Sequence, residues 1–90
     1  MNFASMKNTM DDKDEIAITL IKIGKGLRKL REQKGYTSYE SFSYDHNLSR
    51  MQYWRMEKGQ TNITIKSLLR ILKIHQISLE SFFTMIDKIK

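Results

Sequence analysis

The chain has 90 residues, 40% of them hydrophobic, and a formal net charge of +6. It has no cysteine, which excludes disulfides and thiolate metal sites, and its two histidines are too few for a typical metal site unless carboxylates join them. One domain is expected at this length, and because no apolar run reaches about 18 residues and no signal-peptide pattern opens the chain, we expect a cytoplasmic protein with no membrane segment, metal or cofactor.

The chain is predicted to begin with a flexible N-terminal tail over residues 1–13, followed by a single domain over residues 14–90. From residue 14 onward, apolar residues recur at alternating spacings of four and three, which predicts a helix; they are Ile16, Leu20, Ile23, Leu27 and Leu30. Asp12 and Glu15 have the spacing of a capping box at its start. Gly24 and Gly26 interrupt the pattern and Gly35 ends it, so we expect either one bent helix or two helices.

A short helix is predicted at about residues 38–45, because Thr37 and Glu40 have the spacing of a second capping box. The turn after it contains Asn47, which can adopt the left-handed backbone conformation. Both histidines of the chain are expected to be ordinary turn or cap residues.

The next helix is predicted at about residues 50–58, within the stretch "NLSRMQYWRMEKG". Two independent devices fix its start: the capping box formed by Ser49 and Gln52, and a hydrophobic staple between Leu48 and Tyr53. The glycine that closes the quoted stretch is the residue expected just past a helix C-terminus.

Two more helices complete the predicted fold. After the polar loop "QTN", a fourth helix is marked by Ile65, Leu68, Leu69 and Leu72. A fifth, capped by Ser78, is marked by Leu79, Phe82, Phe83, Ile86 and Ile89. No stretch alternates for long enough to predict a strand, and "NITI" is the only weak candidate. The sequence therefore predicts an all-α fold, a compact bundle of about five helices.

Positive charge is concentrated in two blocks. Residues 21–36 carry six Lys/Arg against one Glu, and residues 47–70 carry five against Glu57 alone. Such blocks indicate a surface that faces a polyanion, either nucleic acid or anionic lipid, or else solvated helix faces.

The helix at 50–58 has two chemically different faces. At about 100° per residue, its inner face comprises Tyr53, Met56 and Glu57. The opposite face comprises Arg50, Met51, Trp54 and Arg55. A short, well-capped helix with a basic outer face, preceded by a short helix and a three-residue turn, is the plan of a helix-turn-helix, whose second helix lies in a DNA major groove.

Residues 24–83 resemble the Xre/Cro-like helix-turn-helix family of phage-repressor-type transcriptional regulators. The matching blocks, in order, are "IGKGLRKLREQKG", "YTSYESFSYDHNLSRMQYWRMEKG" and "TIKSLLRILKIHQISLESFF". The resemblance implies a lambda-repressor-like DNA-binding domain that binds double-stranded DNA in a sequence-specific way, as a homodimer on a two-fold operator. The first helix is longer at its start than the family pattern.

Carried over by position, the resemblance implies a role for individual residues. The core positions are Phe42, Leu48, Tyr53 and Met56. Ser43 is the small residue where two helices approach closely, and Arg31 pairs with Glu57. The base-reading positions are Arg50, Met51 and Arg55, with the outward Trp54 either touching DNA or folding over the following loop; Gln52 is expected to cap rather than to read. The positions that contact the DNA backbone are Thr37, Ser38, Tyr39, Lys58, Gly59, Gln60 and Thr61.

Other functions are less well supported by the sequence. Residues 79–90 carry more apolar side chains than one helix face needs, so they are expected to form a dimer seam or to bind a protein partner; the set is Phe82, Phe83, Met85 and Ile89. A protein-interaction module, such as an antitoxin or adaptor on the same fold, is therefore the alternative. Membrane binding is disfavoured because the apolar stripe of the first helix continues into the expected core. No cysteine nucleophile, phosphate-binding glycine loop or paired carboxylate site indicates an enzyme.

Overall fold

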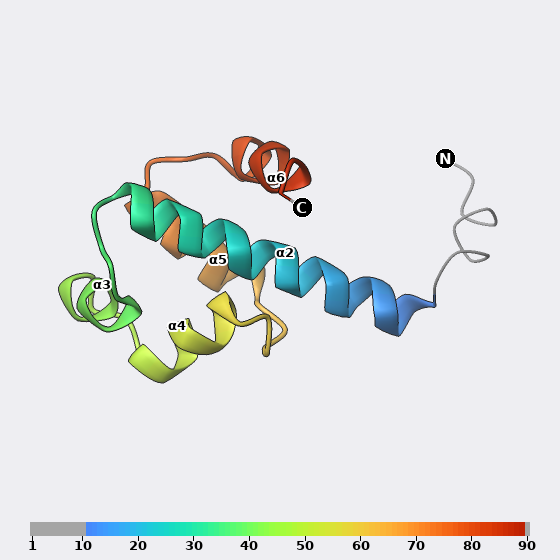
Figure 1. Ribbon diagram of the computed structural model, residues 1–90, viewed down its shortest axis with the longest axis horizontal. Helices are drawn as coiled ribbons and strands as arrows, with labels where there is room; N and C mark the ends of the chain where they lie inside the picture. Colours follow the sequence, from blue (N-terminus) through green and yellow to red (C-terminus); the bar gives the residue numbers. More distant parts are fainter. Residues whose placement is uncertain (1–10, 90) are drawn as a thin grey trace.

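The computed structural model describes residues 11–89, and this range folds into five helices without a strand (Figure 1). With the labels of Figure 1, these helices are α2 (Asp12–Gln33), α3 (Tyr39–Asp45), α4 (Arg50–Glu57), α5 (Ile65–Ile74) and α6 (Leu79–Asp87). The predicted all-α fold is confirmed. The "NITI" stretch is a loop that runs into α5, and its Thr64 caps that helix by accepting a hydrogen bond from the Ser67 N–H.

The long helix α2 is the axis of the molecule: α3, α4 and α6 all contact it (Figure 1). The buried side chains of the core come from all five helices; they are Ile23, Leu27, Leu30, Phe42, Tyr53, Leu68, Ile71, Leu72, Phe82 and Ile86. Phe42 and Tyr53 are thus fully buried as predicted, while Leu48 and Met56 are half-buried and pack against the core. Two of the residues that marked the fourth helix, Ile65 and Leu69, are exposed.

The two glycines of α2 do not break it, because the helix is continuous through both. Each glycine instead lets a neighbour approach closely. A Cβ on Gly26 would overlap the Ile86 side chain of α6, and a Cβ on Gly24 would overlap the backbone carbonyl of Glu57 and lie 2.7 Å from that of Met56. Glycine destabilises a helix interior relative to alanine, but at these two positions it allows α4 and α6 to pack directly on the α2 backbone.

The helix caps follow the predicted chemistry, with two shifts of one residue. Ser49 and Ser78 cap α4 and α6 as predicted, by accepting hydrogen bonds from Gln52 N–H and Ser81 N–H. The first cap is Asp11 rather than Asp12, so the helix begins at residue 12 and not at 14. The α3 cap is Ser38 rather than Thr37. The rest of the predicted tail, residues 1–10, lies outside the described residues.

Phe42 lies at the centre of an aromatic cluster that joins three segments. The His75 ring stacks on the Phe42 ring at 5.2 Å between centroids and 5° between planes, and Tyr53 and His46 lie at 5.0 and 4.8 Å. His46 and His75 follow the last residues of α3 and α5, so their prediction as turn or cap residues is confirmed. The Nε2 atoms of both are buried and form no hydrogen bond with the described residues.

Two absences hold for the part of the chain that the structure describes. Within residues 11–89, no helix is long and apolar enough to cross a membrane. In the same range, no group of three or more His, Cys, Asp or Glu side chains is arranged to hold a metal ion.

The buried His75 should make the fold sensitive to acid. Burial, and next the positive charge of Lys34, lower the pKa of His75 from 6.5 to about 4. The unfolded chain therefore takes up a proton on this imidazole before the folded chain does, and stability should fall as the pH drops from about 6.5 towards 4. We expect urea midpoints of the His75→Gln variant to depend less on pH over this window than those of the unmodified chain. Equal pH slopes for the two proteins would contradict the assignment.

The close approach of α4 to α2 can be tested at Gly24. We expect Gly24→Ala to lower the free energy of unfolding by roughly 1–3 kcal/mol, as overpacking does, because the clash is with backbone carbonyls that cannot rotate away. Lys25→Ala, at the exposed neighbouring position, is the control and should change little. Chemical denaturation followed by circular dichroism measures both; a more stable Gly24→Ala variant would show that α4 can move off α2.

Candidate nucleic-acid interface

α3 and α4 form a helix-turn-helix whose turn is fixed by short contacts. Ser43 of α3 is buried and small where the two helices meet. Asn47 has the predicted left-handed conformation, with φ of 55°, and the Leu48 N–H then donates to the Ser43 carbonyl at 2.8 Å. α4 then begins at Arg50, directly after its Ser49 cap. The geometry of the turn therefore sets the direction in which α4 leaves it.

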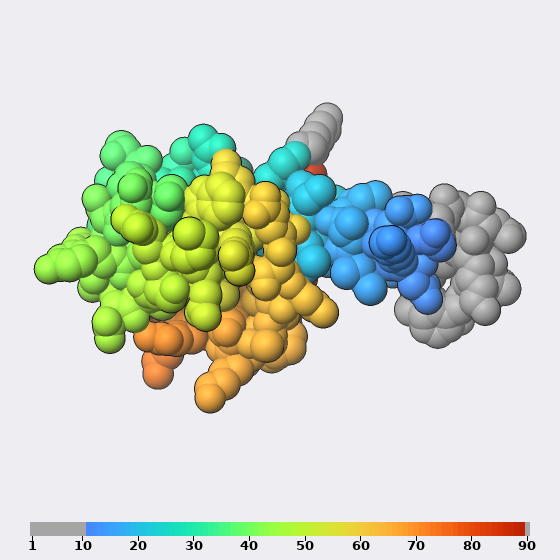
Figure 2. All heavy atoms as spheres, turned by 90° about the horizontal axis from the view of Figure 1, so that it is seen from below, coloured from blue at the N-terminus to red at the C-terminus, as the bar shows by residue number. Residues whose placement is uncertain are grey.

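The two faces predicted for α4 are those observed. Tyr53 is buried against the core, and Met56 is half-buried. The outward residues Arg50, Met51 and Arg55 are exposed, and Trp54 is half-buried at the edge of this face. Figure 2 views the side of the molecule on which α3, α4 and the loop after α4 lie together.

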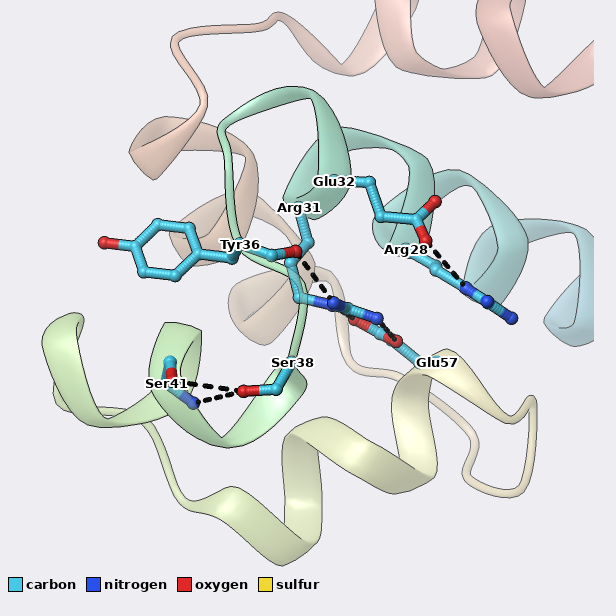
Figure 3. Close-up of polar contacts among 7 residues, drawn as sticks. All are labelled: Arg28, Arg31, Glu32, Tyr36, Ser38, Ser41 and Glu57. Atoms are coloured by element: carbon cyan, nitrogen blue, oxygen red, sulfur yellow. Dashed lines mark hydrogen bonds and ion pairs between the residues drawn. The ribbon is translucent and has the colours of Figure 1, made fainter.

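Glu57, the last residue of α4, is tied to α2 by an ion pair with Arg31. Arg31 Nε donates to Glu57 Oε2 at 2.7 Å and Nη2 donates to Oε1 at 3.1 Å, while Nη1 donates to the Tyr36 carbonyl at 3.0 Å (Figure 3). Only 6% of either charged side chain is exposed. The hydrogen bonds that Arg31 donates to Glu57 raise the pKa of Arg31, so the guanidinium stays charged. One guanidinium thus joins α2, the loop before α3 and the end of α4.

Tyr53 lies beside this pair. Burial, and next the Glu57 carboxylate, raise the pKa of the Tyr53 hydroxyl, so the phenol stays neutral. Its oxygen forms no hydrogen bond with acceptable geometry to the described residues. The ring therefore serves the packing of α4, as predicted, and not the outer surface.

The loop after α4 continues the outer surface. The N–H groups of Lys58, Gly59 and Gln60 donate to carbonyls in the last turn of α4, at 3.1, 3.2 and 2.9 Å. Gly59 has φ of 68° and packs closely on the backbone of Ile21 in α2. These N–H groups are thus committed to ending the helix. The side chains that this loop presents are those of the exposed Lys58 and Gln60 and of the half-buried Thr61.

The start of α3 differs from the predicted capping box. Ser38, not Thr37, caps α3: its Oγ accepts from the Ser41 N–H at 3.1 Å and lies 3.1 Å from the Ser41 Oγ (Figure 3). Thr37 is consequently left exposed, and Tyr39 is half-buried with its ring against the core. Of the three residues predicted to contact the DNA backbone here, Thr37 has the freest side chain.

Two contacts and one exposed aromatic side chain of this region were not predicted from the sequence. Arg70 of α5 donates a hydrogen bond to the Asn47 carbonyl at 3.1 Å, which ties the turn between α3 and α4 to α5. The Tyr36 hydroxyl donates to Asp45 at 2.8 Å, which raises the pKa of Tyr36. Tyr44 is 87% exposed and lines a shallow groove with Arg50. Of these three features, only the exposure of Tyr44 could have been predicted, because in a helix Tyr44 points away from the buried Phe42.

Comparison with known proteins places this geometry among regulators. No protein-family model matches the chain. Control protein C.MunI of Mycoplasma sp is 35% identical over 68 residues, which cover 76% of this chain and 92% of that protein. Plasmid copy control protein CopR of Streptococcus agalactiae is 40% identical over 45 residues, about half of each chain.

Two solved structures have the same fold. The restriction-modification controller protein C.AhdI of Aeromonas hydrophila is 30% identical with a TM-score of 0.64, and the match covers 73% of this chain and 98% of that one. A point mutant of the restriction-modification controller protein C.Esp1396I is 36% identical with a TM-score of 0.65, over 77% and 86% of the two chains.

The Arg31–Glu57 pair should be far more important to stability than the other ion pair described. We expect Glu57→Gln to cost roughly 3–5 kcal/mol of unfolding free energy, because it leaves a buried guanidinium without its counter-charge. The matched control is Glu32→Gln, which removes the charge from an exposed pair with Arg28 and should cost about 0.5 kcal/mol or less. Urea unfolding measures both, and similar losses would show that the buried pair is dispensable.

Proposed function

Because this chain belongs to the Xre/Cro-like helix-turn-helix family of transcriptional regulators, together with the restriction-modification controller proteins, we propose that it binds duplex DNA with α4 in the major groove, as a homodimer. The chain is a sequence-specific DNA-binding regulator of transcription. Its relatives are named as regulatory proteins and not as enzymes. We place the chain in the cytoplasm, with the DNA that it is proposed to bind.

The observation that supports the proposed docking mode most directly is the state of Arg50 and Arg55. Both are exposed on the outer face of α4, and neither forms an ion pair or a side-chain hydrogen bond with the described residues. The Ser49 cap, the buried Tyr53 and the Glu57 ion pair hold the helix that carries them. A free guanidinium on a fixed helix is suited to bidentate contact with O6 and N7 of guanine.

The other residues of this face have more limited roles in the proposal. Met51 is 54% exposed and is suited to contact with a thymine methyl group. Trp54, at the edge of the face, is proposed to touch the sugar-phosphate backbone or a thymine methyl. Gln52 contributes its backbone N–H to the Ser49 cap, and its side chain is exposed.

Contacts to phosphates are proposed on both sides of α4. Lys58, Gln60 and Thr61 follow it, and Thr37 precedes α3, with Ser38, Tyr39 and Gly59 shaping the backbone at these two places. Such contacts add affinity that depends on salt but carry no sequence information. The division of labour is therefore between the outer face of α4, which reads bases, and the flanking loops, which hold the backbone.

A two-fold dimer would place two such helices in successive major grooves about 34 Å apart, or at a multiple of that distance. The predicted seam at residues 79–90 has fewer exposed apolar side chains than expected from the sequence. Phe82 is completely buried, Met85 and Ile89 are half-buried, and Phe83 is the exposed aromatic residue of α6. This surface also remains the place where the alternative, a protein partner, would bind.

Base reading and backbone contact can be separated by two alanine substitutions. We expect Arg55→Ala to relax the preference at one operator position by roughly 1–3 kcal/mol, about 5- to 150-fold, and to leave the other positions unchanged. Lys58→Ala should weaken specific and random duplexes alike and reduce the salt slope by about 1. Selection from a random duplex library at two salt concentrations supplies the operator and the comparison.

Arg28→Ala, an exposed arginine of α2, is the control and should leave the selected operator unchanged. The docking mode is wrong if Arg55→Ala and Lys58→Ala reduce binding to specific and random DNA equally. Absence of duplex binding at low salt, with one stoichiometric protein partner recovered instead, would favour the protein-interaction alternative.

A further inference from the structure

The first two turns of α2 extend beyond the helix bundle, and the third lies at its edge, where Gly59 packs on Ile21. Figures 1 and 2 show the start of α2, in blue, projecting from one end of the bundle. We call residues 12–22 the arm. The apolar side chains Ile16, Ile18 and Ile21 of the arm are exposed, by 53%, 45% and 46%. These three side chains do not form one patch, because Ile18 and Ile21 lie on other sides of the helix than Ile16.

The arm is additional to the helix-turn-helix domain. The resemblance to the family begins at Gly24, where α4 packs on α2. The match to C.AhdI covers nearly all of that protein but leaves about a quarter of this chain without a counterpart. The arm thus lies outside the residues that carry the family resemblance and needs another explanation.

One face of the arm continues the stripe that packs the core. At 100° per residue, Ile16 and Leu20 lie in line with the buried Ile23 and Leu27, whereas Ile18 lies on the opposite side. The part of this stripe within the bundle, at Ile23 and Leu27, is buried by the other helices. At Ile16, no residue among those described covers it, and the side chain is exposed. Beside it, Thr19 and Lys22 line a shallow groove with the exposed Phe83 of α6.

The charges along α2 indicate what kind of partner fits. The first turn is acidic, with Asp12, Asp14 and Glu15, while the residues from Lys22 to Lys29 are basic. An acidic start is repelled by DNA and by anionic lipid, which disfavours both as ligands of the arm. A second α2 in the opposite direction, in contrast, would place acidic turns against basic ones.

We propose that the apolar face of the arm binds the same face of a second copy of this chain, in an antiparallel pair that also covers Phe83. The pair is isologous: where a residue of one copy contacts a second residue of the partner, the reverse contact is made as well, as two-fold symmetry requires. Ile16 and Leu20 form the centre of the contact. Glu15 and Lys22, seven residues apart on the same edge of the stripe, each face the other residue on the second copy, the pairing that flanking positions make in antiparallel coiled coils.

This inference rests on the proposed function only in requiring a homodimer, and it is tested without DNA. Sedimentation equilibrium of the full chain measures the dimer dissociation constant. We expect Ile16→Glu to raise this constant at least about tenfold, since it places a charge at the buried centre of the seam. Ile18→Glu is the matched control, because the same residue, with similar exposure, lies on the opposite face of the same arm; it should leave the constant within about twofold.

Charge reversal tests the antiparallel direction. Glu15→Lys and Lys22→Glu should each weaken the dimer, and the double variant should restore it, because reversing both charges recreates each pair. Circular dichroism of all variants must show an intact helical fold, and DNA selection with them must give the same half-site, which separates failure of the seam from failure of base reading.

Three results would overturn the inference. One is an unmodified chain that stays monomeric at millimolar concentration. The second is an equal effect of Ile16→Glu and Ile18→Glu. The third is a double charge variant no better than the single ones, which would exclude the antiparallel pairing even if a dimer exists.

Discussion

The position of α4 depends on one buried guanidinium, that of Arg31. Arg31 forms two hydrogen bonds with Glu57 and a third with the Tyr36 carbonyl, so it connects α2, the loop that leads into α3, and the last turn of α4. Buried ion pairs add little net stability compared with apolar packing, but they tolerate few alternative geometries. Because Gly24 also brings the end of α4 against the α2 backbone, the reader is held at its C-terminal end by charge and by contact together.

Much of this architecture could be predicted from local sequence signals. The caps at Ser49 and Ser78 and the left-handed Asn47 each depend on chemistry within a few residues, and the structure confirms all three. The apolar period identified α2, α5 and α6, and capping residues identified α3 and α4. The separation of α4 into an inner face with Tyr53 and an outer face with Arg55 follows from helix geometry alone.

Where local patterns left a choice, packing made it. Thr37 and Ser38 are both good caps, as are Asp11 and Asp12, and the choice between neighbours depends on how the helix meets the core. The Arg31–Glu57 pair joins residues 26 positions apart, so no spacing rule predicts it and only the family resemblance did. The support of the turn by Arg70 had no such precedent. The base and phosphate contacts remain predictions, because they depend on a partner that α4 meets only in the complex.

The continuity of α2 has a consequence for the whole assembly. The same unbroken helix carries the arm at one end and contacts the end of α4 at Gly24, so this helix sets the position of the arm relative to α4. Each residue inserted into or removed from a helix changes its length by about 1.5 Å and rotates the two flanking parts relative to each other by about 100°. If the arms join two copies, the distance and phase between half-sites are then encoded in the number of residues between Ile16 and Gly24. Operator spacing would be a property of helix length, independent of the residues that read the bases.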